Sequence, residues 1–279
     1  MSALNRRPGF IVLAPILWGL LVSKGSAAEP LQDALTQMKS TDVIKRRIAA
    51  QELVNLRNPD SVPALLQALS DKDTYVRTLA VRALGYMHWT AAEPRLEEVL
   101  AGDKDPQVRE TAGLSLRFLN DPNTIPALCK ALKDPAEQVR LTAILSLAYY
   151  KNASSTPALI EVINDKSSAV RRTALFALGQ IADPAAVPAL KSGLKDTDSL
   201  VRANAAQALG KTPGKEGLVE LKETLKDPDP LVQISAAWAL AMHGDRSGNE
   251  IAAGAAKSSQ HEIQLLATET IKMIKDKQP

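Results

Sequence analysis

The stretch Val170–Gly179, which reads VRRTALFALG, decides the fold because the chain repeats it with small changes. Close copies lie at Val76–Gly85 and Val201–Gly210. A fixed period of 31 or 32 residues is typical of a solenoid, in which stacked units replace a single central core. The repeated Arg marks this period at Arg46, Arg77, Arg109, Arg140, Arg171 and Arg202, with Gln233 in the seventh place.

A second motif, Pro-Ala-Leu, follows the first. In the unit that begins at Asp165, apolar residues recur at helical spacing from Val170 to Leu178, and again from Val187 to Leu194. Each unit is therefore predicted to be a hairpin of two helical arms, about 12 residues each. We expect Asp165 to cap the first arm, and the proline to be tolerated in the first turn of the second. The prolines are Pro63, Pro94, Pro126, Pro157 and Pro188.

The repeat divides the chain into units and two ends. Helices this short are marginal alone, so stacked neighbours must cover their apolar faces and the ends must be capped. A lone helix over residues 30–40, with Leu31 and Leu35, is expected to cap the front, and a last helix with Ile263 and Ile271 to close the back. The predicted units are near 41–70, 71–102, 103–133, 134–164, 165–195, 196–226 and 227–258, with a C-terminal cap at 259–279.

The motifs at Val76–Gly85, Val170–Gly179 and Val201–Gly210 resemble the short HEAT-like repeats of 31 residues found in bacterial and archaeal proteins and in phycobilin lyases. The resemblance covers roughly residues 30 to 275. It implies an all-α fold: a right-handed α-solenoid of about seven helical hairpins with terminal capping helices. These motifs are specific for the repeat and not for any one function.

Residues 1–28 have the layout of a secretory signal peptide. Two arginines precede the apolar run Phe10–Val22, and the small residues Ser26–Ala28 then offer a cleavage site. The alternative is a retained membrane anchor, but a spanning helix needs about 20 apolar residues and this run is shorter. The pattern predicts cleavage after Ala28 and an exported bacterial protein, periplasmic or extracellular, without an integral membrane segment.

Loss of this leader would change the charge balance. The whole chain has 34 basic and 31 acidic residues, a net charge of +3. The leader contains Arg6, Arg7 and Lys24 and no acidic residue, so 31 residues of each sign remain without it. Nucleic-acid binding depends on neutralisation of phosphates by Lys and Arg. A neutral chain therefore gives no reason to predict a nucleic-acid partner.

The recurring Arg has a candidate partner in the Asp that opens the next unit. The resemblance to HEAT-like repeats implies that this Arg pairs with a loop Asp and ties units together, so we interpret the series as structural and not as an anion site. Exposed ion pairs contribute only about 0–1 kcal/mol each, which predicts a role in register more than in stability. The predicted ladder joins Arg77, Arg109, Arg140, Arg171 and Arg202 to the series Asp71, Asp103, Asp134, Asp165, Asp196 and Asp227.

The sequence predicts no catalytic residue, no metal site and no cofactor. Asp-x-Asp pairs such as Asp71 and Asp73 lack the Gly and distal Glu of an EF-hand loop and are interpreted as helix caps. The pair His261-Glu262 resembles the His-Glu pairs of deoxyhypusine hydroxylase, a di-iron enzyme on a HEAT-like scaffold, but that family needs several pairs and this chain has one. The only cysteine, Cys129, is interpreted as a partly buried apolar residue.

Aromatic residues break the repetition at one turn of the unit. The residue after the Gly slot is usually polar, but three consecutive units carry an aromatic there. Five of the eight aromatic residues outside the leader fall at or near this turn. They either fill crevices between units or form a partner-binding strip along one edge, because aromatic side chains dominate many binding hot spots. They are Tyr86, Trp89, Phe118, Tyr149 and Tyr150.

Two functional hypotheses follow. The leading one is an exported, non-enzymatic scaffold or adaptor that binds a protein or peptide through the solenoid groove or the aromatic edge. The alternative is an accessory lyase-like enzyme or small-ligand-binding subunit, for which His88 beside Trp89 is the one hint. The groove is expected on the side of the second arms, which is concave in most solenoids.

Overall fold

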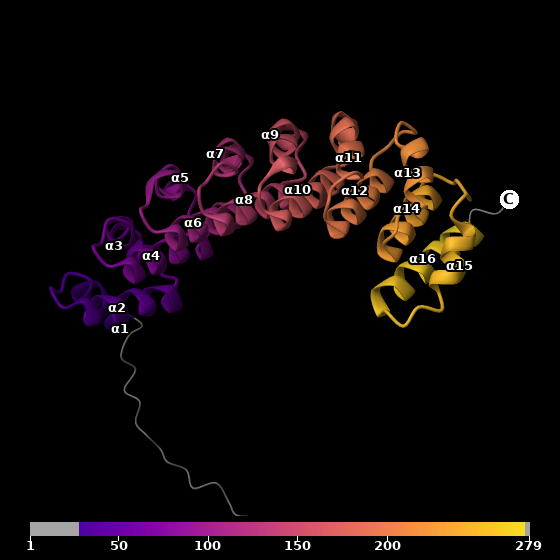
Figure 1. The fold of residues 1–279 in the computed structure, drawn as a ribbon. Helices are drawn as coiled ribbons and strands as arrows, with labels where there is room; N and C mark the ends of the chain where they lie inside the picture. The colour runs from indigo at the N-terminus through magenta and orange to yellow at the C-terminus, as the bar shows by residue number, and fades with distance from the viewer. Residues whose placement is uncertain (1–27, 277–279) are drawn as a thin grey trace, which may run out of the picture.

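A computed structural model describes residues 28–276, and each regular element in that range is an α-helix or a 3₁₀ helix. Figure 1 shows the helices arranged as an arch. The first arms of the units are α2 (Val43–Leu56), α4 (Thr74–Tyr86), α6 (Pro106–Leu119), α8 (Glu137–Tyr150), α10 (Ser168–Ile181), α12 (Ser199–Lys211) and α14 (Pro230–Met242). The second arms are α3 (Val62–Ala68), α5 (Glu93–Gly102), α7 (Ile125–Ala131), α9 (Thr156–Glu161), α11 (Val187–Gly193), α13 (Leu218–Thr224) and α15 (Asn249–Ala255).

Two further helices stand at the ends of this series. α1 (Ala28–Gln37) packs against α2, with Leu31 and Ala34 buried between them. α16 (His261–Asp276) packs against α14 and α15 and buries Ile263. Seven hairpins with a helix at each end form an all-α solenoid, which confirms the predicted fold class.

The two arms differ in length, contrary to the prediction of about 12 residues in each. The first arms have 13 or 14 residues, whereas the second arms have 6 to 10. A 3₁₀ turn explains the difference. In the first unit the side chain of Asn58 accepts a hydrogen bond from the backbone of Asp60 and starts the turn Pro59–Ser61, so the α-helix begins only at Val62.

Small residues let the first arms approach closely. A side chain placed on Gly179 of α10 would lie 2.9 Å from the Cα of Ala208 in α12, and one on Gly85 of α4 would lie 2.6 Å from the Cβ of Ser115 in α6. The repeated Gly and Ala therefore fix the separation between neighbouring units. Ser115 adds a hydrogen bond there, because its hydroxyl donates to the carbonyl of Val81 at 3.0 Å.

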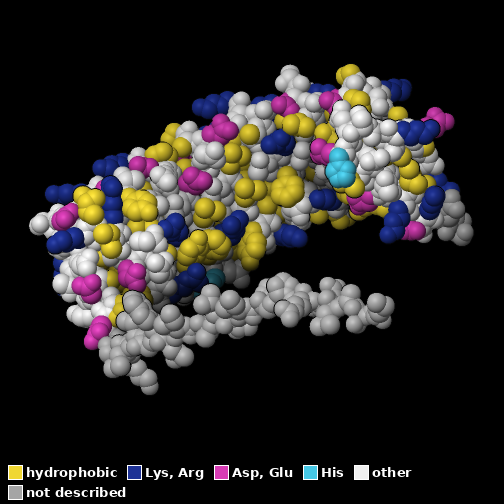
Figure 2. All heavy atoms as spheres, turned by 90° about the horizontal axis from the view of Figure 1, so that it is seen from below, with side chains coloured by type: hydrophobic (Ala, Val, Ile, Leu, Met, Phe, Trp, Pro, Cys, Tyr) yellow, Lys and Arg dark blue, Asp and Glu magenta, His cyan; other side chains and the backbone are white. Residues whose placement is uncertain are grey.

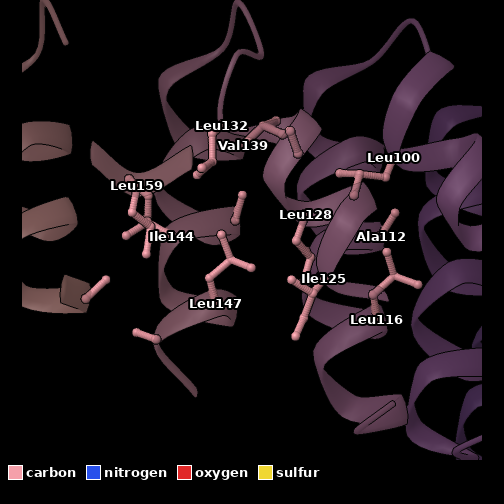
Figure 3. Close-up of a cluster of buried hydrophobic side chains, with 14 of the residues drawn as sticks. Leu100, Ala112, Leu116, Ile125, Leu128, Leu132, Val139, Ile144, Leu147 and Leu159 are labelled. Carbon is pink, nitrogen blue, oxygen red and sulfur yellow. The ribbon is translucent and has the colours of Figure 1, made fainter. Parts of the chain in front are cut away.

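The hydrophobic core runs along the solenoid between the two rows of arms. Figure 3 shows its middle part, where Leu116 and Leu147 of the first arms meet Leu128 and Leu159 of the second arms. These four leucines are fully buried. The last unit also has a small cluster of its own, formed by Ile234, Ala237, Ala252, Ile263 and Ala267. The core is thus a series of local contacts between neighbours, as expected for stacked repeats.

The first arms line the concave side of the arch. In Figure 1 the short helices α5, α7, α9 and α11 lie along its outer, convex side, and α6, α8, α10 and α12 lie along the inner side. The expectation that the second arms line the groove is therefore wrong. Which row becomes concave depends on the angle between successive units, and the 31-residue pattern contains no direct signal for that angle.

The predicted signal peptide lies outside the described residues, except for Ala28, the first residue of α1. Within residues 28–276, no helix has both the length and the apolar character needed to cross a membrane.

Candidate functional site

Each recurring Arg joins two successive units. Nε and Nη2 of Arg77 donate to the two carboxylate oxygens of Asp103 at 2.7 and 2.9 Å, while Nη1 donates to the backbone carbonyl of Asp71 at 3.0 Å. The Arg thus holds the Asp turn of its own unit and that of the next. The ion pairs of this Arg–Asp ladder measure 2.7 or 2.8 Å and are Arg46–Asp71, Arg77–Asp103, Arg109–Asp134, Arg140–Asp165, Arg171–Asp196 and Arg202–Asp227.

The ladder is more buried than we assumed from the sequence. The side chains of Arg77 and Asp103 are only 5% and 8% exposed. Burial raises the pKa of Asp103, but the hydrogen bonds from Arg77 and from the backbone of Asp105 outweigh it and hold the pKa below its ordinary value. Breaking such a shielded pair leaves a charge without its partner. The pair is thus more shielded than the exposed-pair estimate assumed, and loss of one partner is expected to cost more than that estimate.

The Asp residues of the ladder do not cap helices as predicted. In the unit that begins at Asp165, the N-cap of α10 is Ser167, whose hydroxyl accepts from the backbone nitrogen of Val170. Asp165 instead pairs with Arg140 and accepts a hydrogen bond from the backbone of Ser167 at 2.8 Å. Capping belongs to the residue two positions later because the first Asp is engaged in the turn between units.

The ladder ends at the seventh unit. Gln233 keeps one bond of the repeated Arg, from its side-chain nitrogen to the carbonyl of Asp227 at 2.7 Å. The other Arg residues of the ladder have their Asp partner 25 or 26 residues later, but the residue 25 positions after Gln233 is Ser258. Both partners of a seventh ion pair are thus replaced together.

The predicted aromatic residues form two contacting pairs. Tyr86 and Phe118 lie with ring centroids 5.4 Å apart, and Tyr149 and Tyr150 with centroids 5.8 Å apart. Tyr86, Tyr150 and Trp89 are half-buried and pack against the core, whereas Tyr149 is 57% exposed. The structure therefore places three of the five as partial fillers between units, keeps Phe118 half-buried against Tyr86 and leaves Tyr149 open to solvent.

Tyr150 fills a gap that the repeat leaves between α6 and α8. The Gly slot of α6 holds Arg117, so this end of the helix lacks the glycine that brings α4 and α6 together. Tyr150 reaches across, donating its hydroxyl to the carbonyl of Leu116 at 3.1 Å and accepting from Thr124 at 3.1 Å. The side chain of Arg117 meanwhile lies over the ring of Phe118, 5.4 Å from its centroid.

The sequence analysis missed an apolar group on the concave side. Leu114, Leu145 and Phe176 occupy the fifth position after the ladder Arg in three successive units, where the first, second and sixth units have the polar residues Gln51, Arg82 and Gln207 and the seventh has Trp238. That change from polar to apolar was the available signal. Together with Tyr149 and Leu200, which lie on the same helix face because they are one or two turns from that position, they form a surface we call the concave strip.

Several side chains of the concave strip are open to solvent. Leu145 is 43% exposed, and Phe176 and Leu200 are each 41% exposed. Figure 2 looks onto this face and shows hydrophobic side chains along its middle with basic side chains beside them. A hollow of about 450 Å³ lies here, lined by Leu145, Arg172, Phe176, Leu200, Gln207 and Leu231, with Glu262 of α16 at its border.

A pair of carboxyl groups stands beside the aromatic edge. Burial, the negative charge of Asp121 and a hydrogen bond with it raise the pKa of Glu93. Both carboxyl groups lie close enough to Tyr150 to act on its hydroxyl, whose pKa is raised chiefly by burial. Glu93, Asp121 and Tyr150 therefore form a cluster of ionisable side chains at the aromatic edge. The sequence analysis missed the first two because they belong to different units.

The other candidate residues are scattered. His88 is exposed in a left-handed turn at φ 50°, and His243 lies with Nε2 3.1 Å from the carbonyl of Leu209. His261 begins α16. Cys129 is half-buried on α7, and burial raises the pKa of its thiol. Among residues 28–276, no group of three His, Cys, Asp or Glu side chains is placed to hold a metal ion.

Comparison with known proteins identifies the repeat. The family profile for HEAT repeats matches residues 28–117, 69–148, 93–173, 125–210 and 156–229. A segment of 74 residues is 35% identical to phycocyanobilin lyase subunit alpha of Synechococcus elongatus. This matched segment makes up 26% of this chain and 27% of that protein. The chain thus matches about a quarter of the length of this curated relative.

Solved structures resemble the fold at low sequence identity. The X-ray structure of YibA of Escherichia coli has a TM-score of 0.60 at 21% identity, over 89% of this chain and 95% of that one. An engineered protein has a TM-score of 0.52 at 22% identity, over 88% of this chain and 78% of that one. The complex of CpcE and CpcF of phycocyanin lyase from Nostoc has a TM-score of 0.48 at 22% identity, over 88% and 94%.

The comparison with the lyase subunit corrects one prediction. We predicted from the sequence that the chain is not an enzyme. A relative 35% identical over 74 residues is a subunit of a lyase, so the repeat has enzyme subunits among its relatives and the prediction is wrong. The accessory lyase-like alternative is the better supported of the two hypotheses.

Proposed function

The chain belongs to the HEAT repeat family, and from that premise we propose that it is a lyase-type repeat subunit that binds a partner protein across its concave face. The observation that carries this proposal is the concave strip. Leu145, Tyr149, Phe176 and Leu200 expose between 41% and 57% of their surface on one face of adjacent helices. Contiguous apolar surface with aromatic side chains is typical of protein-binding sites.

The lyase-type assignment has two supports. One is the similarity to phycocyanobilin lyase subunit alpha, over about a quarter of its length. The other is the carboxyl pair of Glu93 and Asp121 next to Tyr150. A lyase that adds a group across a double bond must deliver a proton, and a carboxyl group with a raised pKa can hold that proton nearer to neutral pH.

Site-directed photo-crosslinking tests the binding face. A benzophenone amino acid replaces Gln207 on the concave face or, as a matched control, Lys130 on the convex face, and the full chain is irradiated in its own cells. We expect one protein adduct from position 207 and none from position 130. Adducts from both positions, or from position 130 alone, would contradict binding across the concave face.

The lyase-type chemistry is tested with the cross-linked partner identified and purified. The two proteins are mixed with phycocyanobilin as the probe, and the absorbance spectrum is followed over time. Because proton transfer by a positioned side chain contributes about 10²-fold or more, Glu93→Gln should slow the spectral change by about that factor. Glu98→Gln, on the same helix and paired with Arg95 at the surface, is the matched control. Equal rates for both variants would show that Glu93 does not transfer the proton in this reaction.

We also propose that the protein acts outside the cytoplasm. The support is the arrangement of basic residues, the apolar run Phe10–Val22 and the small residues up to Ala28. Alkaline phosphatase, which is active only after export, is fused to the C-terminus of the full chain. High activity that is lost on deletion of residues 2–28 supports export, and low activity of the full fusion argues against it.

A further inference from the structure

We infer that the segment held by the concave strip is an acidic amphipathic α-helix of the partner, lying across the first arms along the length of the solenoid. The inference rests on the proposed function, since it names the kind of partner that the concave face binds. It follows from two independent properties of this face: the spacing of its apolar residues and the sign of its charge.

The spacing comes from the repeat. Leu114, Leu145 and Phe176 hold the same position in α6, α8 and α10, so each is separated from the next by the distance between two packed helices, about 8–10 Å. Seven residues of an α-helix advance about 10.5 Å. A partner helix with an apolar residue at every seventh position would therefore place one side chain against each unit in turn.

The shape of the face allows such a helix to lie on it. Tyr149 and Leu200 widen the apolar surface on either side of the line through Leu145 and Phe176, and the hollow beside Phe176 continues to Leu231. An amphipathic helix buries an apolar stripe of about 100° and leaves its other sides to solvent. The strip therefore offers apolar surface on both sides of the line along which such a helix would lie.

The charge of this face is unbalanced. On the first arms from α4 to α12 the positions beside the strip hold four cations, Arg82, Arg117, Arg172 and Lys211, and one anion, Glu110, and Glu262 of α16 brings a second anion to the hollow. Within residues 28–276 none of the four cations forms an ion pair.

The surroundings of these cations differ from those of the ladder. Arg82 donates to Gln51 at 3.2 Å, and Lys211 lies over the ring of Phe176 at 5.7 Å from its centroid. Arg172 is exposed at the border of the hollow. Carboxylates placed beside the apolar stripe of a partner helix would meet these groups and neutralise them.

The apolar part of the strip favours a helix over a nucleic acid. Cations and aromatic rings also occur where single-stranded nucleic acids bind, but there the rings stack on bases and the cations follow a regular backbone. Here the middle of the strip is aliphatic as well as aromatic, with Leu145, Leu200 and Leu231 around the hollow. Nucleic acid is accordingly one of the competitors in the test.

The test measures binding of designed peptides to the full chain by fluorescence anisotropy. The probe is a labelled peptide of about 20 residues, long enough to cross three units, with Leu at every seventh position and Glu beside it. The controls are a scrambled peptide of the same composition, a version with Lys in place of Glu, and a labelled oligothymidine. We expect the acidic helix to bind at least about tenfold more tightly than each control.

Charge reversal on the protein examines the electrostatic half of the inference. Arg172→Glu combined with Lys211→Glu should weaken binding of the acidic peptide about tenfold and strengthen binding of the basic peptide. Lys130→Glu on the convex side is the matched control and should leave the affinities for both peptides unchanged. Phe176→Ser should weaken binding of the acidic peptide by a similar factor. Val219 is an exposed apolar residue of α13, and Val219→Ser should leave that binding unchanged.

Three results would overturn the inference: equal binding of the scrambled peptide, no effect of the double charge reversal, or preferential binding of the oligothymidine. The crosslink from position 207 separates this failure from that of the proposed function. If a protein is captured there but the captured segment is extended or basic, the acidic-helix inference is wrong and the proposed function stands. If no protein is captured, the proposed function itself fails.

Discussion

Arg171 and Arg172 are neighbours in the chain and lie in opposite environments. Arg171 belongs to the ladder, paired at 2.7 Å with Asp196 of the next unit. Arg172 faces the concave side, exposed beside Phe176 and without an ion pair in the described part of the chain. The ladder side is nearly the same in six units, whereas the concave side differs from unit to unit. The comparison teaches that regular positions hold the scaffold together, whereas irregular positions on the same helices form the proposed binding surface.

Acid should produce the largest effect, because it acts on several pairs of the ladder at once. Burial raises the pKa of Asp134, but its hydrogen bonds outweigh this and leave the pKa lowered, and the hydrogen bond from Arg171 lowers that of Asp196 directly. Carboxyl groups with lowered pKa stabilise the fold fully above their ordinary value of 3.8 and lose that contribution as the pH falls below it. Urea unfolding followed by circular dichroism should show stability falling between about pH 4 and pH 2.

An unchanged urea midpoint from pH 6 down to about pH 2 would mean that the ladder does not stabilise the fold. High salt provides a control, because screening weakens exposed charge interactions much more than shielded ones.

Removal of one ladder Arg should be the most damaging single charge deletion. Arg109→Ala leaves Asp134 shielded and without its partner, which should cost about 3 kcal/mol in the free energy of unfolding. The matched variant Arg172→Ala removes an Arg of the concave side and should cost less than about 0.5 kcal/mol. Chemical denaturation measures both. Equal costs would abolish the distinction between the two sides.

A methyl group at the closest approach between units should also destabilise the scaffold. Gly179→Ala would place Cβ 2.9 Å from the backbone of Ala208, so α10 and α12 must separate. Overpacking of this kind costs about 1–3 kcal/mol, which thermal unfolding can measure. Gly102→Ala is the control, because a Cβ there meets nothing within 4 Å. A cost for Gly102→Ala as large as that for Gly179→Ala would point to an effect of helix conformation instead of packing.

Completion of the ladder should give a smaller, favourable effect. Gln233→Arg combined with Ser258→Asp recreates both partners at the usual spacing of 25 residues. We expect a gain of about 0.5–1 kcal/mol and slower hydrogen exchange in α16. Each single substitution lacks its partner and serves as the control in a double-mutant cycle. A cycle with no coupling energy would show that the last unit is held by its hydrophobic cluster alone.

Substitution within the concave strip should have the smallest effect on stability. Leu145→Asn is expected to change the free energy of unfolding by less than about 0.5 kcal/mol, because Leu145 is exposed. Leu147→Asn, two residues further along α8, buries a polar group in the core and should cost more than about 3 kcal/mol. Thermal unfolding of the two variants distinguishes them. A large loss for Leu145→Asn would make the strip part of the core and not a binding surface.

The sequence predicted the scaffold well and the candidate site only in part. The Arg and Asp series were identified as partners, and the ends of the solenoid as capping helices. Phe118 and Tyr149 were noticed because they replace the polar residue that usually follows the Gly slot. Phe176 was missed because it lies in the middle of a first arm, away from that slot. Glu93 and Asp121 could not be paired from the sequence, since they are 28 residues apart in different units.

The sequence by itself determined the period, the helical arms and the identity of the ladder partners, because these depend on contacts between a residue and the same short stretch of the next unit. Only the tertiary structure decided which row of helices is concave, how deeply the ladder is buried and which apolar residues stay exposed. Those properties depend on the angle between successive units. Small differences in packing, such as Gly179 against Ala208 or Tyr150 in place of a close helix contact, add up along the arch.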